Sequence, residues 1–208
     1  MIIQKRLGNG AFGVVYKVKE EGTSNVYAMK DILCLNSSDI QNTIREAVTL
    51  RRISHENVIA IVSVGDFHDR QALHMLLLTE YCPGGSLNDR LARPSSDQQN
   101  LKWMIQTTKA VAYLHSCNVV HRDLKADNVL LTASEDVKLG DFGLAREYIA
   151  LKRAGVRQDD GSWLSTYTEY YMESGIGPIH WVAPEFFGHH YTEKADVFSL
   201  GTLLFAIL

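Results

Sequence analysis

The chain has few cysteines and no long apolar run. Its three cysteines, Cys34, Cys82 and Cys117, stand far apart and form no pair at the spacing of a metal site or a redox motif. Such sparse cysteines are typical of a reducing compartment, so we expect three unpaired thiols. No stretch approaches the roughly 18 apolar residues that span a bilayer, and the start lacks the apolar core of a signal peptide. These absences predict a soluble intracellular protein, cytoplasmic or nuclear, with no membrane span.

The chain also lacks an excess of charge of either sign. Its 208 residues carry 21 Lys and Arg against 24 Asp and Glu, which gives a formal net charge of -3. Without a basic field, nothing favours a nucleic-acid or anionic-membrane partner. With 46% apolar and 22% charged residues, the composition is that of an ordinary globular chain that can bury a sizeable core.

Hydrophobic patterning predicts a small sheet and one helix in the first third of the chain. Residues 1 to about 33 alternate apolar and polar around glycines, which predicts antiparallel strands. Apolar residues recur near helical spacing from Ser38-Asp39, with Asp39 in a capping neighbourhood. Two more strands are predicted near Val58–Val64 and Leu73–Leu78.

Residues 81–86, Tyr-Cys-Pro-Gly-Gly-Ser, form the clearest break, because this composition continues neither a strand nor a helix well. We expect a hinge between two lobes there. Beyond it, Leu101–His115 has a helical pattern, whereas 153–177 is polar and predicts a long loop, a kind of segment that is usually functional or disordered. The apolar tail Leu203–Leu208 is too short to cross a membrane and predicts a buried helix that is cut short.

A glycine-rich stretch, Gly8-Asn9-Gly10-Ala11-Phe12-Gly13, lies between two predicted strands. Glycines let a backbone turn tightly and approach a polyphosphate closely. A dinucleotide site of the Rossmann type would need a helix after the glycines, but the pattern continues as a strand through Val18. Phosphate binding and a plain glycine-rich hairpin remain the two interpretations.

Lys30 ends an apolar strand, where it could neutralise phosphate oxygens. A lone strand lysine is usually a solvated surface charge. Glu46, on the predicted helix, is a natural partner, because a Lys–Glu pair positions the ammonium and keeps it charged.

The strongest signal is a set of polar residues between apolar runs: Asp123, Lys125 and Asn128, followed by Asp141. Phosphoryl transfer needs a carboxylate to orient and deprotonate a hydroxyl, oxygen ligands for Mg²⁺, and a cation near the developing charge. Chance does not readily assemble such a set.

These residues stand in the strings His-Arg-Asp-Leu-Lys-Ala-Asp-Asn and Asp-Phe-Gly, with Ala-Pro-Glu further on, and the chain resembles a protein kinase domain from its first strand to Leu208. The resemblance implies an α+β, two-lobed fold. It comprises an N-lobe (1–80) with a small antiparallel sheet, a hinge (81–86), and a mainly helical partial C-lobe (87–208) with an activation segment (141–185). It also implies further helices after Leu208, so we expect a fragment of a longer kinase.

The resemblance assigns a role to each polar residue. Asp123 is implied as the catalytic base, Lys125 as the cation near the transferred phosphoryl group, and Asn128 and Asp141 as the Mg²⁺ ligands. The residues implied to contact ATP or line its site are Leu7, Gly8, Gly10, Gly13, Val15, Ala28, Lys30, Glu46, Thr79, Glu80, Cys82, Leu130 and Asp141. Thr79 falls at the gatekeeper position, the backbone of 80–82 resembles the adenine-binding hinge, and the apolar members could equally be core. Asp196 is implied to brace the backbone beside Asp123.

Two features disagree about the acceptor hydroxyl. Lys125 follows the serine/threonine-kinase pattern, whereas Pro178 stands in a Pro-Ile-x-Trp loop that resembles tyrosine kinases. We favour serine and threonine, because the catalytic loop takes part in the chemistry. A tyrosine or dual-specificity kinase, an inactive kinase-fold scaffold, and a small-molecule phosphotransferase are the alternatives.

The activation segment is rich in hydroxyls that an upstream kinase could phosphorylate. Ser174 lies nearest the usual serine/threonine site, counting back from Ala183. Arg122 beside the catalytic Asp usually accompanies such activation, because an arginine can capture a phosphate and order the loop. The expected partners are therefore ATP, a protein substrate and an upstream kinase.

Overall fold

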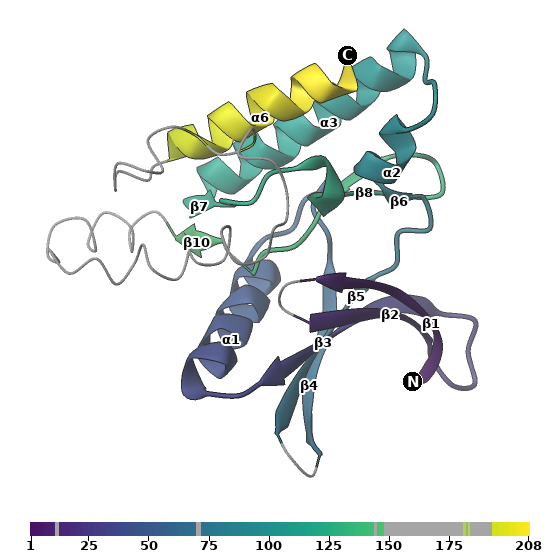
Figure 1. The fold of residues 1–208 in the computed structure, drawn as a ribbon, viewed down its shortest axis with the longest axis vertical. Helices are drawn as coiled ribbons and strands as arrows, with labels where there is room; N and C mark the ends of the chain where they lie inside the picture. Colours follow the sequence, from purple (N-terminus) through teal and green to yellow (C-terminus); the bar gives the residue numbers. More distant parts are fainter. Residues whose placement is uncertain (11–12, 70–71, 144, 148–180, 182, 184–192) are drawn as a thin grey trace, which may run out of the picture. The chain divides into compact units, whose positions relative to one another are not determined.

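A computed structural model describes residues 1–10, 13–69, 72–143, 145–147, 181, 183 and 193–208 (Figure 1). The chain divides into two compact units. The first comprises Met1–Gly85 and Leu130–Gly143, and the second Ser86–Val129 and Leu144–Leu208. The mixture of an antiparallel sheet with helices confirms the predicted α+β class. The predicted loop at 153–177 and Pro178 lie outside the described residues.

The first unit is built on a five-stranded sheet with the order β1-β2-β3-β5-β4, in which every neighbouring pair is antiparallel. Its strands are β1 (Ile2–Gly10), β2 (Gly13–Lys19), β3 (Val26–Cys34), β4 (Ile61–His68) and β5 (Leu73–Glu80). The register pairs Lys30 with Val15 on one side and Leu77 on the other. Since paired residues share a face, these three side chains lie on the same side of the sheet.

Helix α1 (Ser37–Arg52) contacts β3, β4 and β5 (Figure 1). Its N-terminus is closed by a capping box, in which the Asn36 side chain accepts hydrogen bonds from the backbone of Ser38 and Asp39, and the Asp39 carboxylate accepts from the Asn36 backbone. The helix therefore begins one residue before the predicted start. A core cluster of Ile32, Cys34, Met75 and Leu77 lies against the partly buried Ile40, Val64 and Leu73.

The segment between α1 and β4 is fastened to strand β9 (Val137–Leu139) by the backbone. The Ile59 amide donates to the Leu139 carbonyl at 2.9 Å, and the Leu139 amide donates to the Asn57 carbonyl at 2.8 Å. The buried Asn57 side chain donates a further bond to the Val137 carbonyl at 3.0 Å. The backbone at Val58 and Ile59 pairs with Leu139 on β9, so the strand predicted from Val58 begins at Ile61. Strand β9 belongs to a second sheet with the order β6-β8-β9, where β6 is Gly85–Ser86 and β8 is Val129–Leu131.

The second unit is mainly helical, with α2 (Leu87–Leu91), α3 (Asp97–Ser116), the short helix η1 (Ala126–Asn128) and α6 (Glu193–Ile207). Two short antiparallel strands, β7 (Val119–Val120) and β10 (Arg146–Glu147), complete its described part. Helix α3 starts four residues earlier than predicted, because the Ser96 hydroxyl caps it by accepting the Gln99 amide.

Helix α6 packs against α3 (Figure 1). It contains the apolar tail for which a buried helix was predicted, but only one side of that tail is buried. Leu203 and Ile207 are almost fully buried, whereas Phe205 is 80% exposed. Among the described helices, none is long and apolar enough to cross a bilayer.

Candidate active site

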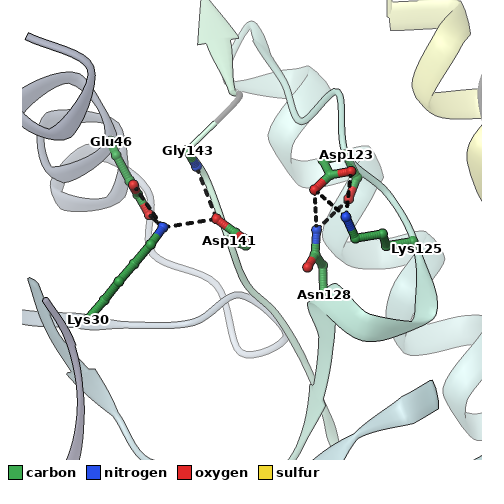
Figure 2. Close-up of polar contacts among 7 residues, drawn as sticks. All are labelled: Lys30, Glu46, Asp123, Lys125, Asn128, Asp141 and Gly143. Carbon is green, nitrogen blue, oxygen red and sulfur yellow. Dashed lines mark hydrogen bonds and ion pairs between the residues drawn. The ribbon is translucent and has the colours of Figure 1, made fainter. Parts of the chain in front are cut away.

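In the first unit, Lys30 lies between two carboxylates. Its Nζ is 3.0 Å from Oε1 and 3.2 Å from Oε2 of Glu46, and 3.1 Å from Oδ1 of Asp141. Strand β3 supplies the lysine, α1 supplies Glu46, and the segment after β9 supplies Asp141. Figure 2 shows the ammonium directed at both partners. The Lys30–Glu46 contact predicted from the sequence is therefore present, and Asp141 joins it.

Burial and charge act in opposite directions on this cluster. Burial alone would lower the pKa of Lys30, but the charges of Asp141 and Glu46 and their hydrogen bonds outweigh it and raise that pKa. Burial raises the pKa of Glu46, and the nearby Asp141 adds to this, while Lys30 opposes it. The side chain of Glu46 is 6% exposed and that of Asp141 is 33% exposed. The lysine is thus a fixed cation, and Asp141 is its solvent-accessible partner.

Strand β9 leads into Asp141, which adopts a φ of 56°. This left-handed conformation is uncommon for a residue other than glycine and occurs at functional sites. The next residue, Phe142, is 1% exposed. Its burial anchors the chain immediately after the strained position, so that the Asp141 carboxylate is held toward Lys30.

The glycine-rich hairpin joins β1 to β2, with Gly10 opposite Gly13 in the ladder. Ala11 and Phe12 lie outside the described residues. Gly13 has a φ of +141°, and a Cβ built there would lie 2.1 Å from the Asp31 carbonyl oxygen. Only glycine fits this close approach to β3. Leu7 and Gly8 on β1 are exposed.

Val15, Ala28 and Leu130, the residues predicted to form the apolar walls of the ATP site, are partly buried. Val15 lies directly opposite Lys30, and Ala28 lies directly opposite Thr79, so these four side chains share one face of the sheet. Leu130, on β8, is also half-buried and belongs to the same unit. The register thus places Val15, Lys30, Ala28 and Thr79 in two adjacent rows on one face of the sheet.

The side chain of Glu80 makes two contacts that the sequence did not indicate. Its Oε1 accepts the Ala60 backbone amide at 2.8 Å and lies 2.9 Å from Nζ of Lys138. It thereby joins the end of β5 to the start of β4 and to β9. Nearby Cys82 is buried, and burial raises the pKa of its thiol to about 12, aided by Glu80 and opposed by Lys138.

In the second unit, the carboxylate of Asp123 is held by two side chains (Figure 2). Lys125 Nζ lies 3.0 Å from Oδ1 and 2.9 Å from Oδ2. The Asn128 amide nitrogen donates to the Asp123 carbonyl at 2.7 Å and to Oδ2 at 2.8 Å. Helix η1 makes this possible by turning the chain back between Lys125 and Asn128. The amide oxygen of Asn128 is thereby directed away from Asp123.

Asp196, at the start of α6, braces the backbone just before Asp123, as the sequence resemblance implied. Its carboxylate accepts the His121 amide at 2.7 Å and the Arg122 amide at 2.8 Å. A third contact joins it to Nε2 of His115 at 3.0 Å. Arg122 has a φ of 72°, so these bonds hold a strained residue next to the carboxylate.

The family follows from the whole sequence. A family model described as the protein kinase domain matches residues 1–208. The chain belongs to the protein kinase family. Members of this family are phosphotransferases that use ATP with Mg²⁺. One relative, serine/threonine-protein kinase Nek3 of Mus musculus, is 32% identical over 206 residues, which are 97% of this chain and 36% of the relative. The chain thus spans about a third of that relative's length.

Sequence reasoning missed three of the polar contacts in and around the site. Lys138 pairs with Glu80, the Asn57 side chain fastens the chain to β9, and His115 contacts Asp196. Their partners are 58, 80 and 81 residues away in sequence, and a local pattern does not reveal contacts at that range. The position of Lys138 three residues before Asp141 is the one sequence signal near the site.

Proposed function

We propose that this chain is the catalytic domain of an ATP- and Mg²⁺-dependent kinase that phosphorylates serine and threonine hydroxyls of proteins. The observation that carries this proposal is the position of the Asp123 carboxylate. It is buried, and its oxygens contact the side chains of both Lys125 and Asn128. A carboxylate held in this way can accept a hydrogen bond from a substrate hydroxyl and take its proton as the hydroxyl oxygen bonds to the γ-phosphorus. ADP is the leaving group.

Lys125 has a second role in this proposal. Its side chain is 13% exposed, and its ammonium contacts both oxygens of the Asp123 carboxylate. When the phosphoryl group arrives beside Asp123, a cation on the same carboxylate offsets the negative charge there. This assignment, together with the similarity to a serine/threonine-protein kinase, favours serine and threonine.

The ligand chemistry fits Mg²⁺. Asn128 presents an amide oxygen directed away from Asp123, and Asp141 presents a partly exposed carboxylate (Figure 2). Within the described residues, no three His, Cys, Asp or Glu side chains gather into a metal site. Mg²⁺ is usually bound by one or two protein carboxylates together with waters and substrate phosphates, and we propose Asn128 and Asp141 as the residues that would hold it. When bound, the ion would offset the negative charge of the phosphates.

The nucleotide would contact residues of the first unit. We assign the phosphates to Lys30 and to the glycine-rich hairpin at Gly8, Gly10 and Gly13. The adenine is assigned to the surface of Val15, Ala28, Thr79 and Leu130, with the backbone of 80–82 as the hinge. Leu7 would cover the base from β1, and Glu46 would act by positioning Lys30. The proposed lobes are 1–80 and 87–208, joined at 81–86.

The remaining assignments are partners and location. We propose a protein substrate, and an upstream kinase that acts on the segment 141–185, which lies largely outside the described residues. An intracellular location, cytoplasmic or nuclear, suits a protein that uses ATP and carries unpaired thiols.

Phosphoamino-acid analysis tests the function. The full-length protein is incubated with radiolabelled ATP and Mg²⁺, with Asp141→Asn as the control. We expect phosphoserine and phosphothreonine from the wild type and at least a hundredfold less label from the control. Equal labelling of the two would refute the catalytic assignment and favour a scaffold. Phosphotyrosine alone would overturn the choice of acceptor, as the loop at Pro178 suggests it could.

A further inference from the structure

Lys17 on β2 lies over the ring of Tyr81, the first residue after β5. The Lys17 ammonium is 4.9 Å from the ring centroid. A cation within about 6 Å of an aromatic face is attracted to it, more strongly when both are partly withdrawn from water. Both side chains are half-buried. The pair therefore joins two segments that are not neighbours in the sheet.

The strand register shows the path of the lysine. Lys17 lies opposite Ala28 on β3, and Ala28 lies opposite Thr79 on β5. Residues in such a cross-strand row share a face, so Lys17 is on the side that also carries Val15 and Lys30. Strands are spaced about 4.8 Å apart, so a lysine can extend across one intervening strand.

The connection matters because of where β2 lies. In the order β1-β2-β3-β5-β4, the hairpin of β1 and β2 is at one end of the sheet and is joined to the rest through the ladder between β2 and β3. Strand β2 begins at Gly13, the last residue of the glycine-rich stretch. The Lys17–Tyr81 contact ties this strand directly to the segment after β5, which the ladder does not reach.

We propose that Lys17 and Tyr81 form a latch that holds β2 against the segment after β5 and thereby sets the affinity for the nucleotide. Lys17 is a positioning residue in this proposal, because it acts on the strand that carries Val15 and Gly13. The proposal rests on the nucleotide site assigned above. Breaking the Lys17–Tyr81 contact loosens that surface but leaves the Asp123 cluster of the second unit unchanged. Nucleotide binding therefore weakens, while the rate of phosphate transfer stays the same.

A double-mutant cycle tests the latch in the full-length protein. Lys17→Met, Tyr81→Leu and the double variant are compared by the Kd of a fluorescent ADP analogue with Mg²⁺, and by KM for ATP and kcat. We expect each single variant to weaken nucleotide binding about two- to fivefold, with kcat unchanged in Lys17→Met. The double variant should lose no more than either single one, because both remove the same contact.

Conservative variants and a matched control separate the latch from a general loss of structure. Lys17→Arg keeps the cation and Tyr81→Phe keeps the ring, so both should retain wild-type affinity. Lys19→Met makes the same change two residues further along the same strand and should have no effect. Additive losses, a loss from Tyr81→Phe equal to that from Tyr81→Leu, or an equal loss from Lys19→Met would overturn the latch. If Tyr81→Leu fails to fold, the series Lys17→Arg, Lys17→Gln and Lys17→Met decides the matter.

The two proposals fail separately. If the wild type binds the ADP analogue but transfers no phosphate, the proposed kinase function fails, and the binding cycle still supports or overturns the latch. If the wild type transfers phosphate and the cycle shows no coupling, the latch alone is wrong.

Discussion

The carboxylate of Asp196 accepts the backbone amide of Arg122 at 2.8 Å, and Arg122 holds a φ of 72° at that point. The acceptor is 1% exposed, so the bond is withdrawn from bulk water. A residue on the helix α6 thus supports an unfavourable backbone conformation one residue before Asp123.

Replacing Asp196 with alanine should destabilise the second unit and lower activity. The His121 and Arg122 amides would each be left buried without this acceptor, at a cost of about 1–3 kcal/mol apiece. We expect the free energy of unfolding to fall by at least about 2 kcal/mol in urea titrations. Asp127→Ala is the matched control, since it removes an exposed carboxylate bound to Asn88 and should cost less than about 1 kcal/mol. Equal losses from the two variants would contradict the brace.

Lys30→Met should abolish most phosphate transfer. The substitution keeps the length of the side chain but removes the cation shared by Glu46 and Asp141. Loss of one such electrostatic contact typically reduces kcat by about a hundredfold or more. Glu46→Gln keeps a hydrogen-bond acceptor and removes only the charge, so its loss should be smaller. Transfer of radiolabelled phosphate measures both variants against Lys19→Met, and an undiminished rate in Lys30→Met would exclude the assigned role.

Gly84→Ala should destabilise the first unit. A Cβ at this position would lie 2.8 Å from Leu131 Cβ and from the carbonyl oxygens of Leu131 and Thr132, and two of these three atoms belong to the backbone. The Gly84 amide also donates to the Leu131 carbonyl at 2.9 Å, so the segment cannot retreat without losing that bond. We expect a loss of about 1–3 kcal/mol in thermal or chemical unfolding.

Gly65→Ala is the control for this change. Gly65 lies within β4, and a Cβ there meets no atom within 4 Å. Its effect should stay within about 0.5 kcal/mol. If the two alanine variants unfold alike, the close approach of Gly84 to Leu131 has no energetic weight.

The stability of the first unit should depend on the charge of His74. Its Nδ1 is 2.7 Å from Oδ1 of Asp31, its Nε2 is 3.4 Å from Oδ2 of Asp69, and its ring stacks on Phe67 with centroids 4.5 Å apart. The hydrogen bond to Asp31 raises the pKa of His74, and Asp69 adds to this against a smaller opposing effect of burial. A raised pKa in the folded state gives stability that is complete below about 6.5, the ordinary imidazole value, and is lost as the pH rises through the folded-state value.

Urea unfolding of the wild type and His74→Gln at pH 5.5 and 8.5 measures this effect. The wild type should exceed the variant in stability by more at the lower pH. His68→Gln, an exposed imidazole on β4, controls for the general loss of a histidine. A difference between wild type and His74→Gln that is the same at both pH values would show that the charge of His74 contributes nothing.

The sequence alone predicted the parts of the site that depend on local chemistry. Lys30 and Glu46 were paired from their places on a strand and a helix, and the contact is present at 3.0 Å. The grouping of Asp123, Lys125 and Asn128 was equally accessible, because one short helix turn brings them together. These contacts could be predicted because their residues lie within five positions of one another, or on a strand and the helix that directly follows it.

Other features needed the tertiary structure. The apolar run that begins at Val58 suits any β pairing, and the pattern alone does not show that Val58 and Ile59 pair with Leu139 on β9 and not with a residue of β5. The early start of α3 came from the Ser96 cap, since its first turn lacks the apolar spacing that predicted the rest. Ser96 with Gln99 three residues later was a detectable capping signal.

The bonds that join Asn57 and Ile59 to β9 tie the C-terminal end of α1 to the strand that leads into Asp141. Four residues lie between Arg52, the last residue of the helix, and Asn57. Glu46 lies six residues before Arg52, about 9 Å along the axis at 1.5 Å per residue. The two carboxylates that contact Lys30 therefore come from elements that the backbone of 57–59 joins, so both depend on the same backbone bonds for their positions.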